Sequence, residues 1–261
     1  MSNEMRGQSQ LDLINRKTYA NAKVLDYYDG LSELFPAEKV LFEQLSSKLE
    51  GAKILDIGVG GGRTTQYLLP RAAEYTGLDY VPEFIERVKK KYQIGNFIAG
   101  DARDLKEFED ESFDFALFSY NGIDAVLHED RLKILNEINR VLKKGGRIML
   151  SSHNRDYRHF RKPYWLTEPK FSLSFAKNLL SYVFFLPRHL QMRKHEVFND
   201  EYAIVNDQDH RFSLLVYYIR VGQQIKQLED IGLSDVKAYN MRGDRVTADK
   251  DSFWIYYLAT K

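Results

Sequence analysis

Short apolar runs alternate with amphipathic stretches through the first half of the chain. The apolar runs occupy residues 53–57, 74–79, 96–100, 113–118 and 147–152. Residues 82–92 and 129–142, which lie between such runs, carry apolar residues at helical spacing. Strands that are apolar throughout and alternate with helices are typical of a parallel sheet covered on both faces. Because crossovers in such sheets are right-handed, the pattern predicts a doubly wound α/β fold.

Further elements are predicted on both sides of this region. Residues 38–49 have the spacing of an amphipathic helix that leads into Gly51. Residues 221–232 predict another helix, and residues 235–239 and 253–260 read as strands. The Gly145-Gly146 pair is expected to end the helix over 129–142.

The alternation breaks between residues 155 and 213. This segment gathers many of the aromatic residues and four of the six histidines. We interpret it as an insertion that caps the carboxyl edge of the sheet, not as an independent domain. The expected organisation is an N-terminal helical lid (1–50), a core (51–154 and 214–261) and the insertion (155–213).

Composition narrows the class of protein. The 261 residues are 44% hydrophobic and 29% charged, as in ordinary globular proteins. The 38 Lys and Arg residues nearly balance the 37 Asp and Glu residues. The net charge therefore creates no electrostatic field that would favour binding to nucleic acid or to an anionic membrane. The absence of cysteine excludes disulfides, thiolate nucleophiles and cysteine-ligated zinc. The start lacks the apolar core of a signal peptide, and no apolar run reaches the ~18 residues of a membrane span, so we expect a cytoplasmic protein.

A glycine-rich loop follows the first predicted strand. In ILDIGVGGGRTT (54–65), glycines permit a tight turn and close approach of the backbone to a ligand, while the next helix presents unpaired N–H groups. Arg63 stands where the dinucleotide fingerprint GxGxxG needs Gly or Ala. Asp56 ends the first strand and Asp79 the second, where a carboxylate can bind two ribose hydroxyls.

Five motifs in order complete this pattern: LDIGVGGGRTT, GLDYVPEFIERVKKK, GDAR, SFDFALFSYNGI and EINRVLKKGGRIMLSSHN. With them the chain resembles the class I S-adenosylmethionine-dependent methyltransferases, closely over residues 51–154 and more loosely over 214–261. The resemblance implies a Rossmann-like, seven-stranded, mostly parallel sheet with the last strand antiparallel. The aromatic-rich, mainly helical insertion would follow the fifth strand. The resemblance also implies S-adenosylmethionine as cofactor and S-adenosylhomocysteine as product.

The resemblance further implies roles for particular residues. The loop from Gly58 to Gly62 would hold the methionine moiety, Asp56 would orient that loop or the cofactor's ammonium group, and Asp79 would bind the ribose. Aromatic residues near the N-terminus, including Tyr27, would close over the cofactor. The expected cofactor contacts are Tyr19, Tyr28, Asp56, Gly58, Gly60, Gly62, Asp79, Tyr80, Asp101, Ala102, Ser119 and Tyr120.

Catalytic candidates come from the residues beyond the fourth and fifth strands. His153 follows a strand at its carboxyl end, where ligands bind in such sheets, and an imidazole can accept a hydroxyl proton at neutral pH. His210, flanked by Asp209, is the second candidate base, and Asn121 follows the fourth strand. No metal site is predicted, since His189 and His195 lack a third ligand at metal spacing.

The acceptor is less constrained. Residues 119–122 read Ser-Tyr-Asn-Gly and lack the [DN]-P-P-[YF] motif of nucleic-acid adenine methyltransferases, which disfavours a nucleic-acid partner. We expect methylation of an oxygen or nitrogen atom of a small or medium organic molecule. The sequence leaves the oligomeric state open, and a dimer is one option. Two alternatives remain: another transferase on this scaffold, such as an aminopropyl transferase using Asp124, and a non-catalytic cofactor-binding interaction protein.

Overall fold

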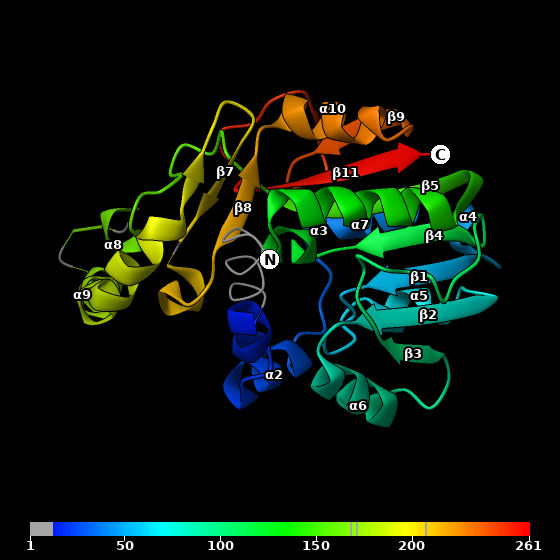
Figure 1. Cartoon of the computed structure of the whole chain (residues 1–261), viewed down its shortest axis with the longest axis horizontal. Helices are drawn as coiled ribbons and strands as arrows, with labels where there is room; N and C mark the ends of the chain where they lie inside the picture. The colour runs from blue at the N-terminus through cyan, green and yellow to red at the C-terminus, as the bar shows by residue number, and fades with distance from the viewer. Residues whose placement is uncertain (1–12, 168, 171, 207) are drawn as a thin grey trace, which may run out of the picture.

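The computed structural model describes residues 13–261, except residues 168, 171 and 207. For residues 209 and 210 it describes the backbone but not the side chains. A central sheet runs through the molecule (Figure 1). Its core strands are β1 (Lys53–Ile57), β2 (Glu74–Asp79), β3 (Asn96–Ala99), β4 (Phe113–Phe118), β5 (Leu142–Asn154), β9 (Ser234–Tyr239) and β11 (Trp254–Thr260). Their order is β9-β11-β5-β4-β1-β2-β3, with the short β10 (Arg245–Val246) beyond β9. The first five are parallel, and β11 runs antiparallel to β5 and β9, so the predicted seven-stranded fold is confirmed.

Helices cover both faces of this sheet. They are α3 (Pro36–Gln44), α4 (Ser46–Leu49), α5 (Thr65–Leu68), α6 (Pro82–Lys91), α7 (His128–Val141) and α10 (Val221–Asp230). The helix α2 (Ala22–Asp29) packs against the start of α6, and residues 13–19 are also helical. Successive residues of β4 alternate between the two cores, as a pleated strand requires. Ala116 and Phe118 pack with α7 and α10, whereas Phe115 and Leu117 pack with α3, α4 and α6. The apolar character of the strands therefore follows from burial on both faces.

The strand β5 is longer than the sequence pattern predicted. It begins at Leu142, directly after α7, so Gly145 and Gly146 lie inside the strand and do not end the helix. A Cβ atom on Gly146 would come within 2.8 Å of a backbone oxygen and 3.2 Å of another, where the register between β4 and β5 shifts. The close approach of two backbones, not a helix stop, therefore requires glycine here.

The insertion is mainly helical and also contains strands that the sequence pattern did not predict. It carries α8 (Tyr164–Thr167), α9 (Leu173–Met192), the 3₁₀ turns η2 (Arg193–His195) and η3 (Asp209–Phe212), and the strands β6 (Val197–Phe198) and β7 (Tyr202–Val205). The following strand, β8 (Val216–Ile219), pairs with β7 and with the end of β5 at His153 and Asn154. Because β11 occupies the other edge of β5 at His153, β8 lies on the β4 edge, beyond the end of β4.

Two segments flank the carboxyl ends of β1, β2 and β4. Figure 1 shows these strands pointing toward the side of the molecule where α2 and the β7–β8 pair lie, with α9 farthest from the sheet. The carboxyl edge of the sheet, beyond which open α/β sheets bind ligands, thus lies between these two segments.

Among the described helices, including the 20 residues of α9, none combines the length and the apolar character that a bilayer crossing demands.

Candidate functional site

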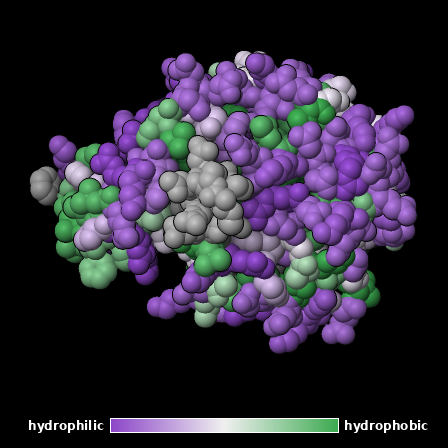
Figure 2. Space-filling view, viewed as in Figure 1, coloured by the Kyte–Doolittle hydropathy of each residue, from purple (hydrophilic) through white to green (hydrophobic). Residues whose placement is uncertain are grey.

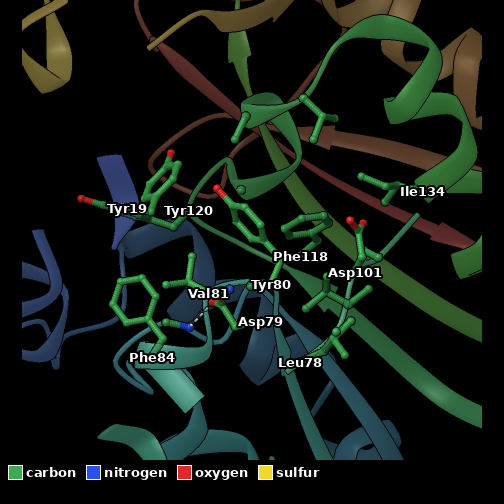
Figure 3. A pocket seen from close by; sticks show the side chains of 18 of the residues that line it. Tyr19, Leu78, Asp79, Tyr80, Val81, Phe84, Asp101, Phe118, Tyr120 and Ile134 are labelled. Atoms are coloured by element: carbon green, nitrogen blue, oxygen red, sulfur yellow. Dashed lines mark hydrogen bonds between the residues drawn. The ribbon is translucent and has the colours of Figure 1, made fainter. Parts of the chain in front are cut away.

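A pocket of about 840 Å³, counted with the open space at its mouth, lies at this edge (Figure 3). Ten of the twelve expected cofactor contacts line it: Tyr19, Tyr28, Gly58, Gly60, Asp79, Tyr80, Asp101, Ala102, Ser119 and Tyr120. They come from the N-terminal segment, the loops after β1, β2 and β3, and the end of β4. The tertiary structure therefore brings together residues that are dispersed over a hundred positions of the chain.

Asp79 links two of the loops that form this pocket. Its Oδ2 accepts a hydrogen bond from the backbone N–H of Gly60 (2.9 Å) and its Oδ1 one from that of Val81 (2.9 Å). Burial raises the pKa of Asp79 to about 6, although the two backbone N–H groups lower it. Each carboxylate oxygen can accept a further hydrogen bond, so a diol could still bind to it.

The glycine loop has the backbone conformation that its residues predicted. Gly58 and Gly60 have φ values of +67° and +52°, which favour glycine. Gly61, which the sequence analysis did not single out, lies against the N-terminal segment, and a Cβ atom there would meet the backbone oxygen of Tyr28 at 2.5 Å. The loop thus approaches both the pocket and the segment that covers it.

Two expected cofactor contacts do not line the pocket. The Asp56 carboxylate is 2% exposed, and its Oδ2 accepts hydrogen bonds from the hydroxyls of Thr64 and Tyr75, both at 2.7 Å. Burial raises the pKa of Asp56 to about 6, although those two hydrogen bonds lower it. Gly62 faces α6, where a Cβ atom would meet Tyr92 at 2.6 Å. Asp56 holds the end of the loop and Gly62 packs the loop on α6, so neither contacts the ligand space directly.

Aromatic residues close the pocket from the N-terminal side. Tyr28 packs edge-on against Tyr19, Phe84 and Tyr120, with ring centroids 5.6–6.2 Å apart. The hydroxyl of Tyr27 lies 3.1 Å from that of Tyr120. Burial raises the pKa of Tyr120, so this phenol stays protonated at neutral pH. The aromatic lid expected of the N-terminal segment is therefore in contact with the end of β4.

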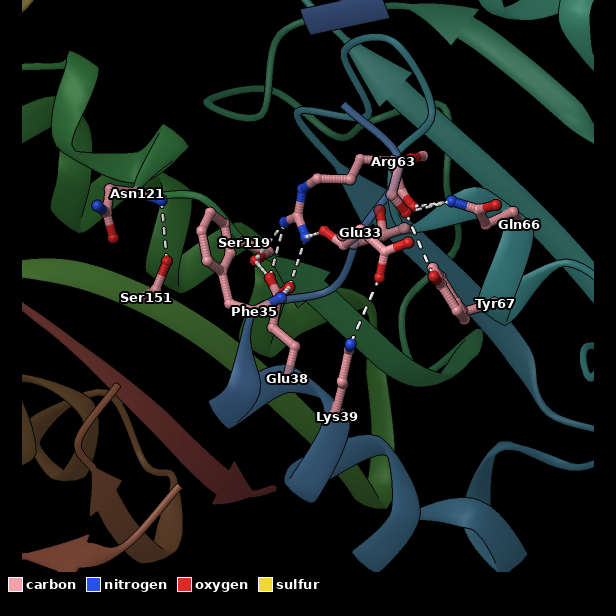
Figure 4. A network of polar contacts seen from close by, with 12 residues as sticks. Glu33, Phe35, Glu38, Lys39, Arg63, Gln66, Tyr67, Ser119, Asn121 and Ser151 are labelled. Carbon is pink, nitrogen blue, oxygen red and sulfur yellow. Dashed lines mark hydrogen bonds and ion pairs between the residues drawn. The ribbon is translucent and has the colours of Figure 1, made fainter. Parts of the chain in front are cut away.

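A buried ion pair fixes the N-terminal segment to the glycine loop (Figure 4). Arg63 donates hydrogen bonds to both carboxylate oxygens of Glu38, at 2.7 Å to Oε1, and one to Ser119 Oγ at 3.3 Å. The Ser119 hydroxyl donates to Glu38, and the guanidinium stacks near the rings of Phe35 and Tyr120. Arg63, which excluded the dinucleotide fingerprint, is thus the centre of a network that joins α3, the glycine loop and β4.

The backbone turns sharply where β4 ends. Tyr120 and Asn121 both have left-handed φ values, +55° and +56°, which are costly for residues other than glycine. The backbone N–H of Asn121 donates to Ser151 Oγ (2.8 Å), which helps to hold this conformation. Within the described part of the chain, the Asn121 side-chain amide is buried and neither polar atom has a partner. A strained backbone and an unsatisfied buried amide together make this position a candidate for a ligand contact.

A larger groove adjoins the pocket and shares Tyr19, Tyr28 and Tyr120 with it. Asn121 and His153, two of the three catalytic candidates, line this groove together with Trp254. The Trp254 Nε1 is buried there without a partner among the described residues. For the third candidate, His210, the side chain lies outside the described part of the structure.

His153 is held by a buried carboxylate. Asp124 Oδ2 lies 2.7 Å from both the backbone N and the Nδ1 of His153. Asp124 Oδ1 accepts hydrogen bonds from Arg131 (2.5 Å) and Ser152 (2.7 Å). Asp124 and Arg131 are almost fully buried. Because a carboxylate paired with a guanidinium accepts hydrogen bonds, Nδ1 carries the hydrogen of the neutral ring, and Nε2 is its basic nitrogen.

Sequence reasoning missed Arg131 and Glu38, and it named Asp124 only for a rival activity. Arg131 lies on the inner face of α7, between the apolar residues of a regular stripe, and its guanidinium lies over the ring of Tyr217. A charged residue on an otherwise apolar helix face was the available signal. Glu38 gave no such signal, because an acid in the first turn of a helix is ordinary. Pro36 begins α3, and Glu38 accepts a hydrogen bond from the Phe35 N–H (2.8 Å) as a capping residue does.

Comparison with known proteins agrees with this geometry. Residues 55–150 match the family model described as a methyltransferase domain. The chain is 34% identical over 109 residues to a demethylmenaquinone methyltransferase of Thermotoga maritima, covering 41% of this chain and 46% of that protein. It is 34% identical over 113 residues to a fatty-acid O-methyltransferase of Mycolicibacterium smegmatis, covering 42% and 40%. The chain spans about half the length of the curated relatives it matches.

A solved structure extends the likeness of fold to most of the chain. It is a 1,6-didemethyltoxoflavin-N1-methyltransferase of Burkholderia thailandensis with 1,6-didemethyltoxoflavin and S-adenosylhomocysteine bound. The TM-score is 0.62 at 15% identity, over 97% of this chain and 90% of that one. With the five ordered motifs and the strand order, the match of residues 55–150 to the methyltransferase domain supports a class I S-adenosylmethionine-dependent methyltransferase core in this chain.

Proposed function

We propose that this chain transfers a methyl group from S-adenosylmethionine to a small or medium organic acceptor. The observation that carries the proposal is that two spaces lie side by side beyond the carboxyl ends of β1, β2 and β4. A pocket with the glycine loop and Asp79 adjoins a groove that contains Asn121 and the His153–Asp124 pair, and Tyr28 and Tyr120 line both. Cofactor and acceptor can therefore meet at the end of β4.

The pocket residues suit the cofactor. Asp79, buried at the end of β2, would accept hydrogen bonds from the ribose hydroxyls. Gly58 and Gly60 would let the backbone approach the methionine moiety, and Asp101 with Ala102 would border the adenine. Arg103 already holds Asp101 through its Nε at 3.0 Å, so the Asp101 carboxylate is oriented before a ligand binds.

The bound cofactor would supply an electrophilic methyl group on a sulfonium. Transfer from it needs alignment and exclusion of water more than covalent help, and alignment alone can supply effective molarities of ~10⁵ M or more. Tyr28 and Tyr120 would exclude water from the end of β4. We propose that residues 1–50 and 155–213 act as the two covers of the site.

His153 is the proposed general base for a hydroxyl acceptor. Asp124 fixes the ring so that Nε2 is the nitrogen that can take a proton, and Arg131 holds Asp124. Asn121 and the Trp254 Nε1 would orient the acceptor with their unsatisfied polar atoms. An amine acceptor that is neutral when bound would need no such base, so this arrangement favours oxygen over nitrogen.

The two rival functions have less support. Aminopropyl transfer with Asp124 as the catalytic acid requires a carboxylate that reaches the substrate, but Asp124 is 1% exposed and is bonded to Arg131, Ser152 and His153. A protein that only binds the cofactor would not need a polar dyad beside the groove. Release of S-adenosylhomocysteine during incubation with S-adenosylmethionine and a cell metabolite extract tests all three functions. Product formation without methyl incorporation into a metabolite would contradict the proposal.

Replacing Asp79 by alanine should weaken binding of S-adenosylhomocysteine by about 1.5–3 kcal/mol, because a hydrogen bond to a charged group contributes about this much. Isothermal titration measures the change, and the unaltered chain should bind this ligand more tightly than NAD. The matched control is Asp104→Ala, since Asp104 is an exposed carboxylate that pairs with Lys106 outside the pocket. An unchanged affinity in Asp79→Ala would remove Asp79 from the site.

Affinity for S-adenosylhomocysteine should fall as the pH is lowered through about 6. The pKa of Asp79 is raised to about 6 in the folded chain, so the carboxylate is ionised above this pH and protonated below it. If only the ionised form binds the ribose, affinity at pH 5 is about tenfold lower than at pH 8. Asp79→Asn should abolish the dependence and Asp56→Asn should keep it. A dependence that persists in Asp79→Asn would assign it to another group.

A further inference from the structure

The face of α9 that points away from the protein is apolar. Leu173 (89% exposed), Leu180 (71%) and Phe184 (75%) are exposed, as are Val183 and Leu190. Their spacing of three, four and seven residues places them on one side of the helix, in a stripe about 27 Å long. Figure 2 shows this stripe as a hydrophobic surface at the end of the molecule farthest from the core. Exposed apolar patches of this kind mark interaction sites.

The segment that carries the stripe is rich in basic residues. Residues 158–195 contain eight Lys or Arg residues and one acidic residue, whereas the rest of the chain contains 30 and 36. The near-neutral total therefore hides a separation of charge, with a net charge of +7 on this segment and −6 elsewhere. Some of this charge is paired, since Arg158 contacts Asp251, and Arg161 and Arg193 contact Glu196 at 3.6 and 3.8 Å. Lys177 and Arg188 are exposed along one border of the stripe.

An apolar stripe bordered by basic residues, on a helix too polar to cross a membrane, matches a helix that lies in the interface of an anionic bilayer. A second copy of the chain is the other partner that such a face could bind. In a twofold dimer the same surface meets itself, so the basic borders of the two stripes, each with Lys177 and Arg188, would lie close to each other. Like charges across an interface are unfavourable, and anionic lipid headgroups are complementary.

We propose that the exposed face of α9 docks on the surface of an anionic lipid bilayer. The apolar side chains enter the boundary between headgroups and acyl chains, and the Lys and Arg side chains contact the headgroup phosphates. Arg188 and Tyr164 also line the groove beside the pocket, so docking brings the groove close to the lipid surface. On the proposed function, an apolar acceptor dissolved in the membrane has a short path to the site; the docking itself does not depend on that function.

Co-sedimentation of the full chain with vesicles tests the proposal. The chain should bind vesicles of phosphatidylcholine mixed with phosphatidylglycerol and bind phosphatidylcholine alone weakly, and added salt should weaken binding. Leu180→Asp with Phe184→Asp should lower the partition coefficient by about tenfold or more, because two apolar anchors are lost. Lys177→Ala with Lys194→Ala should lower it by about fivefold for each charge removed.

Matched controls separate docking from general effects of charge and hydrophobicity. Ile94, 70% exposed and far along the chain from α9, provides Ile94→Asp, and the basic run on α6 provides Lys89→Ala with Lys90→Ala. Both control variants should bind vesicles like the unaltered chain. Unchanged thermal unfolding midpoints would show that every variant folds. If the α9 variants bind vesicles as strongly as the unaltered chain, the proposal is wrong. It is also wrong if the unaltered chain is a dimer that binds no vesicles and Phe184→Asp converts it to a monomer.

Discussion

Replacing His153 by alanine is expected to lower kcat about 10²–10⁴-fold for an acceptor that is methylated on oxygen. The reason is that the variant has no group in place of the Nε2 that takes the hydroxyl proton, while the cofactor pocket is unchanged. The affinity for S-adenosylhomocysteine should therefore stay the same. Steady-state turnover at saturating acceptor measures kcat. Isothermal titration with S-adenosylhomocysteine then measures the affinity of the variant for the product.

Three variants make this prediction specific. His195→Ala removes an exposed imidazole on η2 and should leave turnover unchanged. Asp124→Asn should also lower kcat, because the amide cannot hold the His153 ring as the carboxylate does, and the loss should change with pH. His210→Ala tests the second candidate base. If His153→Ala and His210→Ala both keep nearly full turnover, neither histidine is the base, and nitrogen becomes the favoured acceptor atom.

Glu38→Ala is expected to lower the free energy of unfolding by about 3–5 kcal/mol, because it leaves the buried Arg63 guanidinium without its carboxylate. The Arg63 side chain is 9% exposed, and burial would lower its pKa were it not for the hydrogen bonds to Glu38 that raise it. The same change detaches α3 from the glycine loop and from Ser119. Urea denaturation followed by circular dichroism measures the loss.

Glu33→Ala is the matched control for this change. Glu33 is on the same segment and pairs with Lys39 at 3.4 Å, but its side chain is 81% exposed. Exposed pairs contribute about 0–1 kcal/mol, so little change is expected. The double variant Glu38→Leu with Arg63→Met should lose less stability than either single change, since no buried charge is left unpaired. A loss in Glu38→Ala no larger than in Glu33→Ala would contradict the assigned role of the ion pair.

The cofactor pocket was largely predictable because its chemistry is local in sequence. Gly58 and Gly60 directly follow β1, and Asp79 ends β2, so each is placed by the strand that precedes it. Parallel strands then bring these ends to one edge without further information. Asp56 and Gly62 show the limit of this reasoning. They lie in the same motif, but Thr64 and Tyr75 hold the Asp56 carboxylate away from the pocket, and the backbone of Gly62 lies against α6.

The two buried polar pairs could not be predicted in this way. His153 and Asp124 are separated by 29 positions, and Glu38 and Arg63 by 25, with no periodicity that connects them. Each pair forms only after β4, β5 and α3 have packed. The extension of the sheet by β7 and β8 has the same origin, because β8 pairs with the end of β5 only where β4 has ended.

Hydrophobic periodicity was enough to determine the doubly wound core, because it acts through neighbouring residues and regular strand geometry. The class of cofactor and most of the pocket residues were implied by the resemblance of five ordered motifs to a known family. The exposed stripe of α9 illustrates the opposite case. Its apolar residues and basic neighbours are plain in the sequence, and the insertion was expected to cap the site. Only the tertiary structure decided which side of α9 meets the protein and which meets solvent. Burial is a property of the packed chain, and no local pattern specifies which of two apolar faces remains uncovered.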